Sequence, residues 1–362
     1  MDDRSIARWR LRSQRLAGAT WASATDAVGG LLAVQAENYA QASWAVGTRT
    51  SGLTEPLFRQ LFDDGAILRT HIIRPTWHFV LPDYIRWLTA VTAPRMQPWL
   101  VRQQRAFGLD EGVVDAALER IVGALVGGVH LTRAGLAERL RKTGLPAEGL
   151  HLGMVLMTAE MSALICSGAM QGSEQTWALL DERAPHARRL DRAEALAELA
   201  VRYFTGHGPA TERDLSYWAT LSLADVRAGI AGAGNHLDSF DHGGRTYWYG
   251  GAPPDDRPLE PPAQLLQILD EYYRGYQDSR YLLDVEGMVP RGRETSLGMT
   301  LVDSQMVGNM RRTLARGDVV FDVALHRSLS QTERDAVHDA ADRYAAFLGL
   351  APRLRLREPA GG

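Results

Sequence analysis

The sequence predicts an α+β protein in which helix is in excess. One order of elements occurs three times: a helical stretch, a second helix, then two short strands, the last of which carries a tryptophan. After the prolines between residues 253 and 262, apolar residues alternate as in antiparallel strands. We therefore expect three tandem winged helix-turn-helix units and a small C-terminal β domain with a terminal helix. The predicted boundaries are residues 1–109, 110–188, 189–252 and 253–362.

The strand pairs of the three predicted units are the clearest part of this repeat. They span residues 67–73 with 76–81, residues 165–170 with 176–180, and residues 235–241 with 245–249. Trp77, Trp177 and Trp248 fall in the second strand of each pair. Tryptophan in such a hairpin is most often a packing residue, so the repeat predicts architecture and no ligand.

Capping residues mark the helices of the third unit and of the C-terminal domain. Thr211 with Asp214 and Ser222 with Asp225 are each spaced as a capping box at the start of a short helix. Two such helices joined by a tight turn and followed by a hairpin are typical of a winged helix-turn-helix.

In the C-terminal domain we expect a short helix over residues 265–273 and strands over residues 297–302, 305–314 and 318–325. Ser330 and Glu333 then open a helix that runs to residue 348.

Composition excludes several classes of protein. No stretch approaches the roughly 20 apolar residues that a membrane span needs, and the first residues, MDDRSIARWR, do not have the pattern of a signal peptide. A cytoplasmic location is therefore expected. Cys166 is the only cysteine, which excludes intrachain disulfides and multi-cysteine metal sites. Phosphate-binding loops, dinucleotide motifs and zinc-protease motifs are absent, so we expect no cofactor, no nucleotide and no metal.

Charge is distributed unevenly along the chain. The net charge is −3, but residues 1–109, which we call the basic lobe, hold thirteen arginines against eight acids. The remainder of the chain is acidic. Such an asymmetry is what a protein needs if one lobe meets the anionic DNA backbone. The alternative on charge alone is a solvated helix face with ion pairing between the two halves.

Polar residues that could carry chemistry in the basic lobe are found in the segment Gln35-Ala36-Glu37. The pattern predicts a helix that starts at Ser23 and runs through Val34. If the chain is extended after this helix, the amide of Gln35 and the carboxylate of Glu37 project to the same side. The alternative is a frayed helix end with two solvated polar side chains.

Four segments together resemble one bacterial family, the helix-turn-helix DNA glycosylases that unhook interstrand crosslinks. They are QAE at residues 35–37, RTHIIRPTWHFV at 69–80, LDEYYRGYQDSR at 269–280 and VGNMRRTLARGDVVFDV at 307–323. The resemblance implies tandem winged-helix units and hydrolysis of the N-glycosidic bond of purines alkylated at N7 or N3. The lesions would include bulky adducts or crosslinks, in DNA repair or in self-resistance to a genotoxin.

The same resemblance implies catalytic roles for Gln35 and Glu37. In the family a glutamine–apolar–glutamine or glutamine–apolar–aspartate motif positions the attacking water. Gln35 matches the first residue and Ala36 the second, whereas Glu37 keeps the carboxylate of the aspartate form on a longer stem. Strand cleavage by a lyase would need an amine nucleophile. Because Lys142 is the only lysine and lies outside the basic lobe, we expect hydrolysis alone.

Residues predicted to contact DNA come from the basic lobe and from the matched segments. They are Arg69, His71, Arg74, Trp77, His78, Arg12, Arg311 and Arg312. A role in surface solubility is the alternative for the charged residues, and core packing is the alternative for Trp77.

The expected partner is duplex DNA that contains alkylated purines, bound by a monomer that associates with the nucleoid and with no membrane. A non-enzymatic winged-helix DNA-binding protein or regulator is the second hypothesis. A protein that sequesters a small genotoxin is the third. A regulator would usually be a symmetric dimer, which three unlike units in one chain make awkward.

Overall fold

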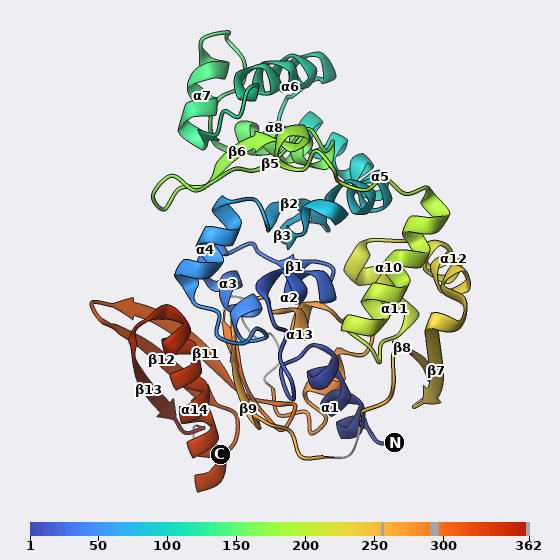
Figure 1. The fold of residues 1–362 in the computed structure, drawn as a ribbon, viewed down its shortest axis with the longest axis vertical. Coiled ribbons are helices and arrows are strands. Elements are labelled where there is room, and N and C mark those ends of the chain that lie inside the picture. Colours follow the sequence, from blue (N-terminus) through green and yellow to red (C-terminus); the bar gives the residue numbers. More distant parts are fainter. Residues whose placement is uncertain (255–256, 290–296, 360–362) are drawn as a thin grey trace.

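The computed structural model describes residues 1–254, 257–289 and 297–359. It is a mixed α and β structure in which helical residues outnumber strand residues, as the sequence predicts (Figure 1). Among the described residues, no helix combines the length and apolar character that crossing a bilayer requires.

One order of elements, namely helix, strand, helix, helix, strand, strand, is present twice in full. The first copy comprises α2 (Ala24–Gly30), β1 (Val34–Gln35), α3 (Tyr39–Gly47), α4 (Glu55–Asp63), β2 (Leu68–Ile73) and β3 (Thr76–Val80). The second copy comprises α6 (Glu111–Leu125), β4 (Leu131–Thr132), α7 (Arg133–Arg141), α8 (Gly149–Met161), β5 (Ile165–Ser167) and β6 (Thr176–Leu179). In each copy the first strand pairs with the last, in the strand orders β1-β3-β2 and β4-β6-β5.

A third copy follows with a reduced first strand. It comprises α10 (Arg192–Gly206), α11 (Glu212–Ala219), α12 (Leu223–Ala233), the short helix η1 (Gly234–His236), β7 (Leu237–His242) and β8 (Arg245–Gly250). A single bridge between Ala210 and Trp248 stands in the place of the first strand. The strand pairs predicted from the sequence are therefore present in all three copies, and Thr211 and Asp214 form the predicted capping box at the start of α11.

Three further helices connect or flank the copies. They are α1 (Asp3–Ser13), α5 (Pro82–Ala106) and α9 (Leu180–Arg183). In Figure 1 the second copy lies above the first, and the third copy lies to the right of the first. α5 leads from the first copy to the second and packs against α8, α10 and strand β2, so the three copies are joined through it.

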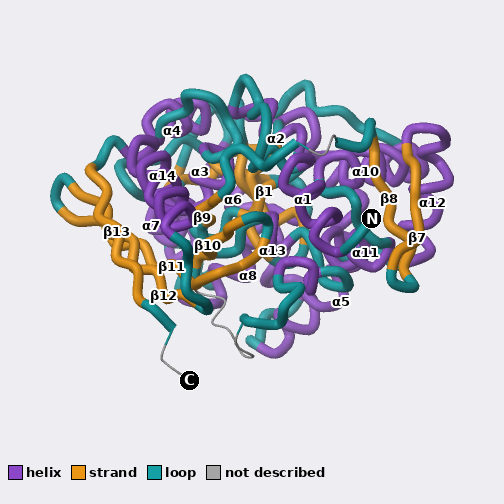
Figure 2. The backbone as a smooth tube through the Cα atoms, turned by 90° about the horizontal axis from the view of Figure 1, so that it is seen from below, coloured by secondary structure: helices purple, strands orange, loops and turns teal. Residues whose placement is uncertain are grey.

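The C-terminal residues form a five-stranded sheet covered by a long helix. Its elements are β9 (Ala263–Leu266), α13 (Glu271–Arg274), η2 (Arg280–Leu283), β10 (Gly298–Val302), β11 (Gln305–Ala315), β12 (Asp318–Leu325), α14 (Gln331–Leu348) and β13 (Ala351–Arg357). The strand order is β13-β12-β11-β10-β9, and only the β12–β13 pair is parallel. Figure 2 shows this sheet and the β7–β8 hairpin at opposite ends of the molecule.

One sequence expectation for this region is wrong, and one strand was not predicted. The helix predicted over residues 265–273 is a strand, β9, followed by the single turn α13. The run of apolar residues is compatible with either element, and pairing with β10 selects the strand. Strand β13 was not predicted, although Leu354 and Leu356 alternate with arginines and pack against the sheet core.

A buried ion pair joins the first copy to the C-terminal region. Arg49, just after α3, donates to both carboxylate oxygens of Asp270, at 2.9 and 2.7 Å, and neither side chain is exposed. Gln14, just after α1, accepts a further hydrogen bond from Arg49 at 2.8 Å. Three segments that are distant in the sequence are thus held by one guanidinium group.

Replacing Arg49 with Met should lower the free energy of unfolding by about 3–5 kcal/mol, because Asp270 would be left buried without its partner. Urea denaturation followed by circular dichroism measures this change. The matched control is Arg353→Met, which breaks an ion pair to Asp318 at a site where the arginine is 63% exposed. Such surface pairs contribute about 0–1 kcal/mol, so equal losses in the two variants would refute the importance of the buried pair.

Candidate active site

The segment Gln35-Ala36-Glu37 lies between the end of α2 and the start of α3. The helix predicted to run through Val34 ends earlier, at Gly30, because Leu32 adopts a left-handed backbone conformation with φ of 67°. The chain is then extended, and Gln35 pairs with His78 of β3. Gln35 is buried at 3% exposure, whereas Glu37 is exposed.

The Gln35 and Glu37 side chains are both held at this turn. The backbone N–H of Glu37 donates to Oε1 of Gln35 at 3.3 Å. The backbone N–H of Trp77 donates to Oε2 of Glu37 at 3.2 Å, and Ala36 donates to the carbonyl of Trp77 at 2.7 Å. The start of β3 therefore fixes the carboxylate while leaving the residue open to solvent.

Arg69 of β2 holds the same segment from its carbonyl side. Its guanidinium group donates to the carbonyls of Ala36 and Glu37, at 2.9 and 3.2 Å, and lies 4.3 Å from the ring centroid of Trp77. It also donates to Oε1 of Gln175. Burial lowers the pKa of Arg69 to about 10, against the opposing charges of Glu160 and Glu37. Arg69 is therefore still cationic at neutral pH.

A buried carboxylate, Glu160 of α8, lies behind Trp77. It accepts hydrogen bonds from the indole N–H of Trp77 at 3.0 Å and of Trp177 at 2.7 Å. The backbone N–H of His71 donates to it at 3.1 Å, and Nδ1 of the same histidine also reaches Oε2. The second copy thereby anchors the hairpin that holds Glu37.

A second buried carboxylate, Glu271 of α13, lies behind Gln35. The backbone N–H of Gln35 donates to Oε1 of Glu271 at 2.7 Å. On its other oxygen, the indole of Trp218 donates at 2.8 Å and Nε2 of His207 lies at 3.3 Å. Burial raises the pKa of Glu271, but the hydrogen bond and charge of His207 and the charge of Arg74 outweigh burial and lower the pKa to about 2.

The residues predicted to contact DNA lie in four separate places. Arg69, His71 and Trp77 surround the Gln35–Glu37 segment, and of these only Trp77 is as much as partly exposed. His78 is buried and Arg74 is half-buried; Arg74 donates to the carbonyl of Trp218 and approaches Nε2 of His78. These distances are 2.9 and 3.3 Å. Of these five side chains only Arg74 and Trp77 are partly exposed, and the contact of all five with DNA stays a prediction.

The remaining three predicted residues lie on other elements. Arg311 and Arg312 belong to β11, where Arg311 is exposed and Arg312 donates to the carbonyl of Ala40 at 3.1 Å. Because Ala40 is the second residue of α3, this contact brings β11 close to the segment that follows Glu37. Arg12 of α1 donates to the carbonyl of Arg257 and does not join this group.

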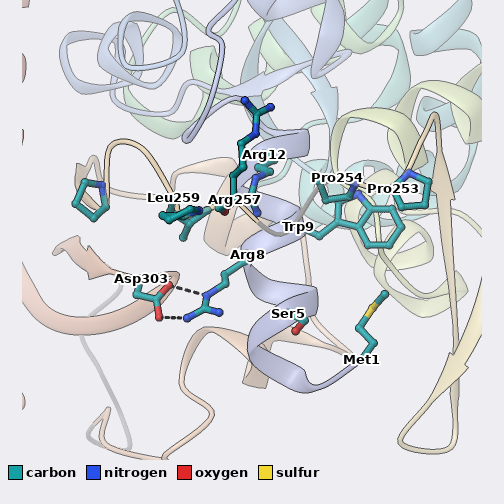
Figure 3. Close-up of a pocket in the computed structure, with 12 residues that line it drawn as sticks. Met1, Ser5, Arg8, Trp9, Arg12, Pro253, Pro254, Arg257, Leu259 and Asp303 are labelled. Carbon is teal, nitrogen blue, oxygen red and sulfur yellow. Dashed lines mark hydrogen bonds and ion pairs between the residues drawn. The ribbon is translucent and has the colours of Figure 1, made fainter.

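Two hollows of similar size open on the surface. One, of about 600 Å³, includes Arg12 and lies between α1 and the proline-rich segment; in it Arg8 pairs with Asp303 (Figure 3). The other, of about 620 Å³, includes Trp77 and Gln175 and so adjoins the Gln35–Glu37 segment. Within the described ranges, no three histidine, cysteine, aspartate or glutamate residues gather to hold a metal ion.

Sequence reasoning missed the residues that support this site from behind. Glu160 was recognisable as a single acid on the otherwise apolar face of α8. Glu271 lies in one of the four segments that carry the family resemblance, but no pattern linked it to Gln35. No sequence pattern singled out His207 from the other histidines.

Comparison with known proteins defines the class of this protein as a DNA glycosylase. A family model described as DNA glycosylase AlkZ-like matches residues 28–347, so the chain belongs to the AlkZ-like DNA glycosylase family. It is 28% identical over 257 residues to the interstrand DNA cross-link repair glycosylase of Streptomyces sahachiroi, covering 67% of this chain and 68% of that protein. The fold matches the structure of Streptomyces sahachiroi DNA glycosylase AlkZ with a TM-score of 0.77 at 22% identity. That match covers 99% of this chain and 100% of the other.

Protonation of His78 should make folding stability depend on pH. Burial, followed by the charge of Arg74, lowers the pKa of His78 from 6.5 to about 3, so the folded state keeps it neutral. Below pH 6.5 the unfolded chain binds a proton that the folded chain does not, and stability falls as the pH falls towards 3. Between pH 6.5 and 5 this one group should cost about 1.5 kcal/mol.

Urea denaturation of the wild type and of His78→Gln at pH 6.5 and pH 5 measures this dependence. The glutamine amide can still donate to the Thr76 carbonyl, which lies 3.0 Å from Nδ1 of His78, and can accept from Arg74. The variant should lose about 1.5 kcal/mol less than the wild type over this range. The same loss in both proteins would show that another group titrates.

Proposed function

We propose that this protein is a monofunctional glycosylase that hydrolyses the N-glycosidic bond of N7- or N3-alkylated purines in duplex DNA. The substrates would include bulky adducts or interstrand crosslinks, in repair or in self-resistance to a genotoxin. The observation that carries the proposal is the fixed pair of Gln35 and Glu37 on an open turn. The Streptomyces sahachiroi relative is an interstrand DNA cross-link repair glycosylase, which supports crosslinks as substrates.

The chemistry follows from the charge of the lesion. Alkylation at N7 makes the purine cationic and a good leaving group, so the enzyme must stabilise an oxocarbenium-like sugar and direct one water to C1′. Glu37 would act as general base and as counter-charge. Because Oε1 of Gln35 already accepts from the backbone of Glu37, the amide NH₂ of Gln35 would hold the water.

Absence of lyase activity is part of the same proposal. A lyase needs an amine that forms a Schiff base with the sugar. The single lysine, Lys142, follows α7 on an exposed surface and pairs with Glu138 at 2.7 Å. The product would therefore be an abasic site in an intact strand.

We infer that the three copies are winged helix-turn-helix units, and that the chain binds DNA as a monomer. Their strand orders support this, since a first strand paired with the last of a hairpin is the arrangement expected of such units. The predicted boundaries at residues 109, 188 and 252 fall between elements. A cytoplasmic location, on the nucleoid when bound to DNA, belongs to the same proposal.

Replacing Gln35 or Glu37 with Ala should each lower the single-turnover excision rate at least tenfold, a loss of about 1.4 kcal/mol or more of transition-state stabilisation. The substrate is duplex DNA that carries 7-methylguanine, and abasic sites are counted after alkali treatment. Strands should remain intact before alkali. Glu119→Ala, which removes an exposed glutamate from α6, is the matched control and should retain full activity.

Undiminished excision in both variants would keep the glycosylase function and reject the Gln35–Glu37 site. Strand cleavage without alkali would reject the monofunctional mechanism. Excision of neither 7-methylguanine nor an N7 crosslink, with DNA binding intact, would favour the non-enzymatic DNA-binding hypothesis.

Arg311 should contribute to DNA affinity through a phosphate contact. It is exposed on β11 next to Arg312, which donates to the carbonyl of Ala40 in α3. Arg311→Ala should weaken binding uniformly across sequences and reduce the slope of log K against log salt by about 1. Fluorescence anisotropy at four salt concentrations measures the slope. Arg189→Ala, which removes an exposed arginine from the loop after α9, is the control. An equal change of the salt slope in both variants would refute a specific contact of β11 with DNA.

A further inference from the structure

The pocket beside the Gln35–Glu37 segment has an apolar and aromatic lining. Its volume is about 620 Å³, and it lies between α7, the start of α8, strand β6 and the indole of Trp77. Trp177, Ala134, Ala137 and Leu152 supply most of the apolar wall. A pocket of this volume is in the range that binds drug-sized molecules, roughly 300–1,000 Å³.

The two indoles in this wall are fixed in orientation by Glu160. The single polar atom of each ring, Nε1, donates to the Glu160 carboxylate, at 3.0 Å for Trp77 and 2.7 Å for Trp177. Because their N–H groups are already satisfied, the rings offer only carbon surface to the pocket. Such rigid aromatic walls favour flat apolar or aromatic groups.

The pocket is continuous with the residues that hold Glu37. Trp77 lines the pocket with its ring and fixes the Glu37 carboxylate with its backbone N–H. Gln175 also lines the pocket and accepts a hydrogen bond from Arg69, which in turn holds the Glu37 carbonyl. Trp77 and Gln175 thus border the pocket and also belong to the hydrogen-bond network that holds Glu37.

The charges on the rim argue against the DNA backbone as the occupant. Glu148 and Glu174 line the opening and are exposed, and carboxylates repel phosphates. Arg133, the one arginine of the lining, donates to the carbonyl of Gly149 at 2.6 Å and keeps its positive charge, so the lining holds two carboxylates against one guanidinium group. An uncharged or cationic group is the better match.

We propose that this pocket binds the flat apolar or aromatic substituent of a bulky N7 purine adduct while the glycosidic bond lies at Glu37. The assignment rests on the proposed glycosylase function and adds the class of lesion. It makes the second copy a specificity element, because the excision of small and large adducts then differs only in contacts to this pocket.

A substitution that fills the pocket tests the proposal. Ala134→Trp places a large ring at an exposed position of the pocket wall, and Ala116→Trp on α6 is a matched exposed control. We expect kcat/KM on duplex DNA with 7-benzylguanine to fall at least tenfold in Ala134→Trp. Excision of 7-methylguanine should stay within twofold, and Ala116→Trp should change neither.

An equal loss on both lesions, or no loss on 7-benzylguanine, would overturn the assignment. The equal loss would point to a pocket for the purine itself. A thermal melt followed by circular dichroism shows whether Ala134→Trp is folded.

Titration calorimetry of the wild type with the free bases separates this proposal from the proposed function. 7-Benzylguanine should bind at least tenfold more tightly than 7-methylguanine. Binding with this preference in a protein that excises no lesion would reject the glycosylase function and keep the pocket. Excision of both lesions without any preference in binding or in kcat/KM would keep the function and reject the pocket.

Discussion

Two consecutive buried acids, Asp270 and Glu271, fix the geometry on which the rest of the site depends. Burying a carboxylate costs several kcal/mol unless charges and hydrogen bonds satisfy it. Asp270 is satisfied by Arg49, just after α3, and Glu271 by the backbone N–H of Gln35 in β1. If the candidate catalytic segment moved relative to the C-terminal region, Asp270 or Glu271 would lose its partner and be left as a buried unpaired charge.

Glu160 provides the same kind of constraint from the second copy. Through Trp77 it fixes the strand that donates to Glu37, and Glu271 fixes the residue two positions earlier. The segment is thus held between two buried carboxylates that lie on different parts of the chain. Catalytic groups need placement within about 0.5 Å, and hydrogen-bonded supports of this kind supply it. The exposed carboxylate of Glu37 is itself held by the backbone N–H of Trp77.

Local signals explain which parts of the fold the sequence predicts. The caps at Thr211 and Ser330 and the turn at Gly243-Gly244 act over a few residues, and the elements they mark are present. The supports of the site act over longer distances: Glu160 is 89 residues from His71, and Glu271 is 236 residues from Gln35. No periodicity reports such pairs. For the same reason the burial of His71 on β2 and of His78 on β3 was not predicted, since distant parts of the chain, including Glu160 and Glu271, cover these strands.

The positive surface charge of the basic lobe is smaller than its sequence suggests. Arg10, Arg49 and Arg69 are buried, and the half-buried Arg74 donates to the carbonyl of Trp218. These guanidinium groups satisfy carbonyls and carboxylates of the protein itself. We therefore expect attraction to the DNA backbone to come mainly from exposed arginines, including those of α5 and β11. Arginine suits both tasks, because its planar group makes several directed hydrogen bonds in the interior and contacts phosphate at the surface.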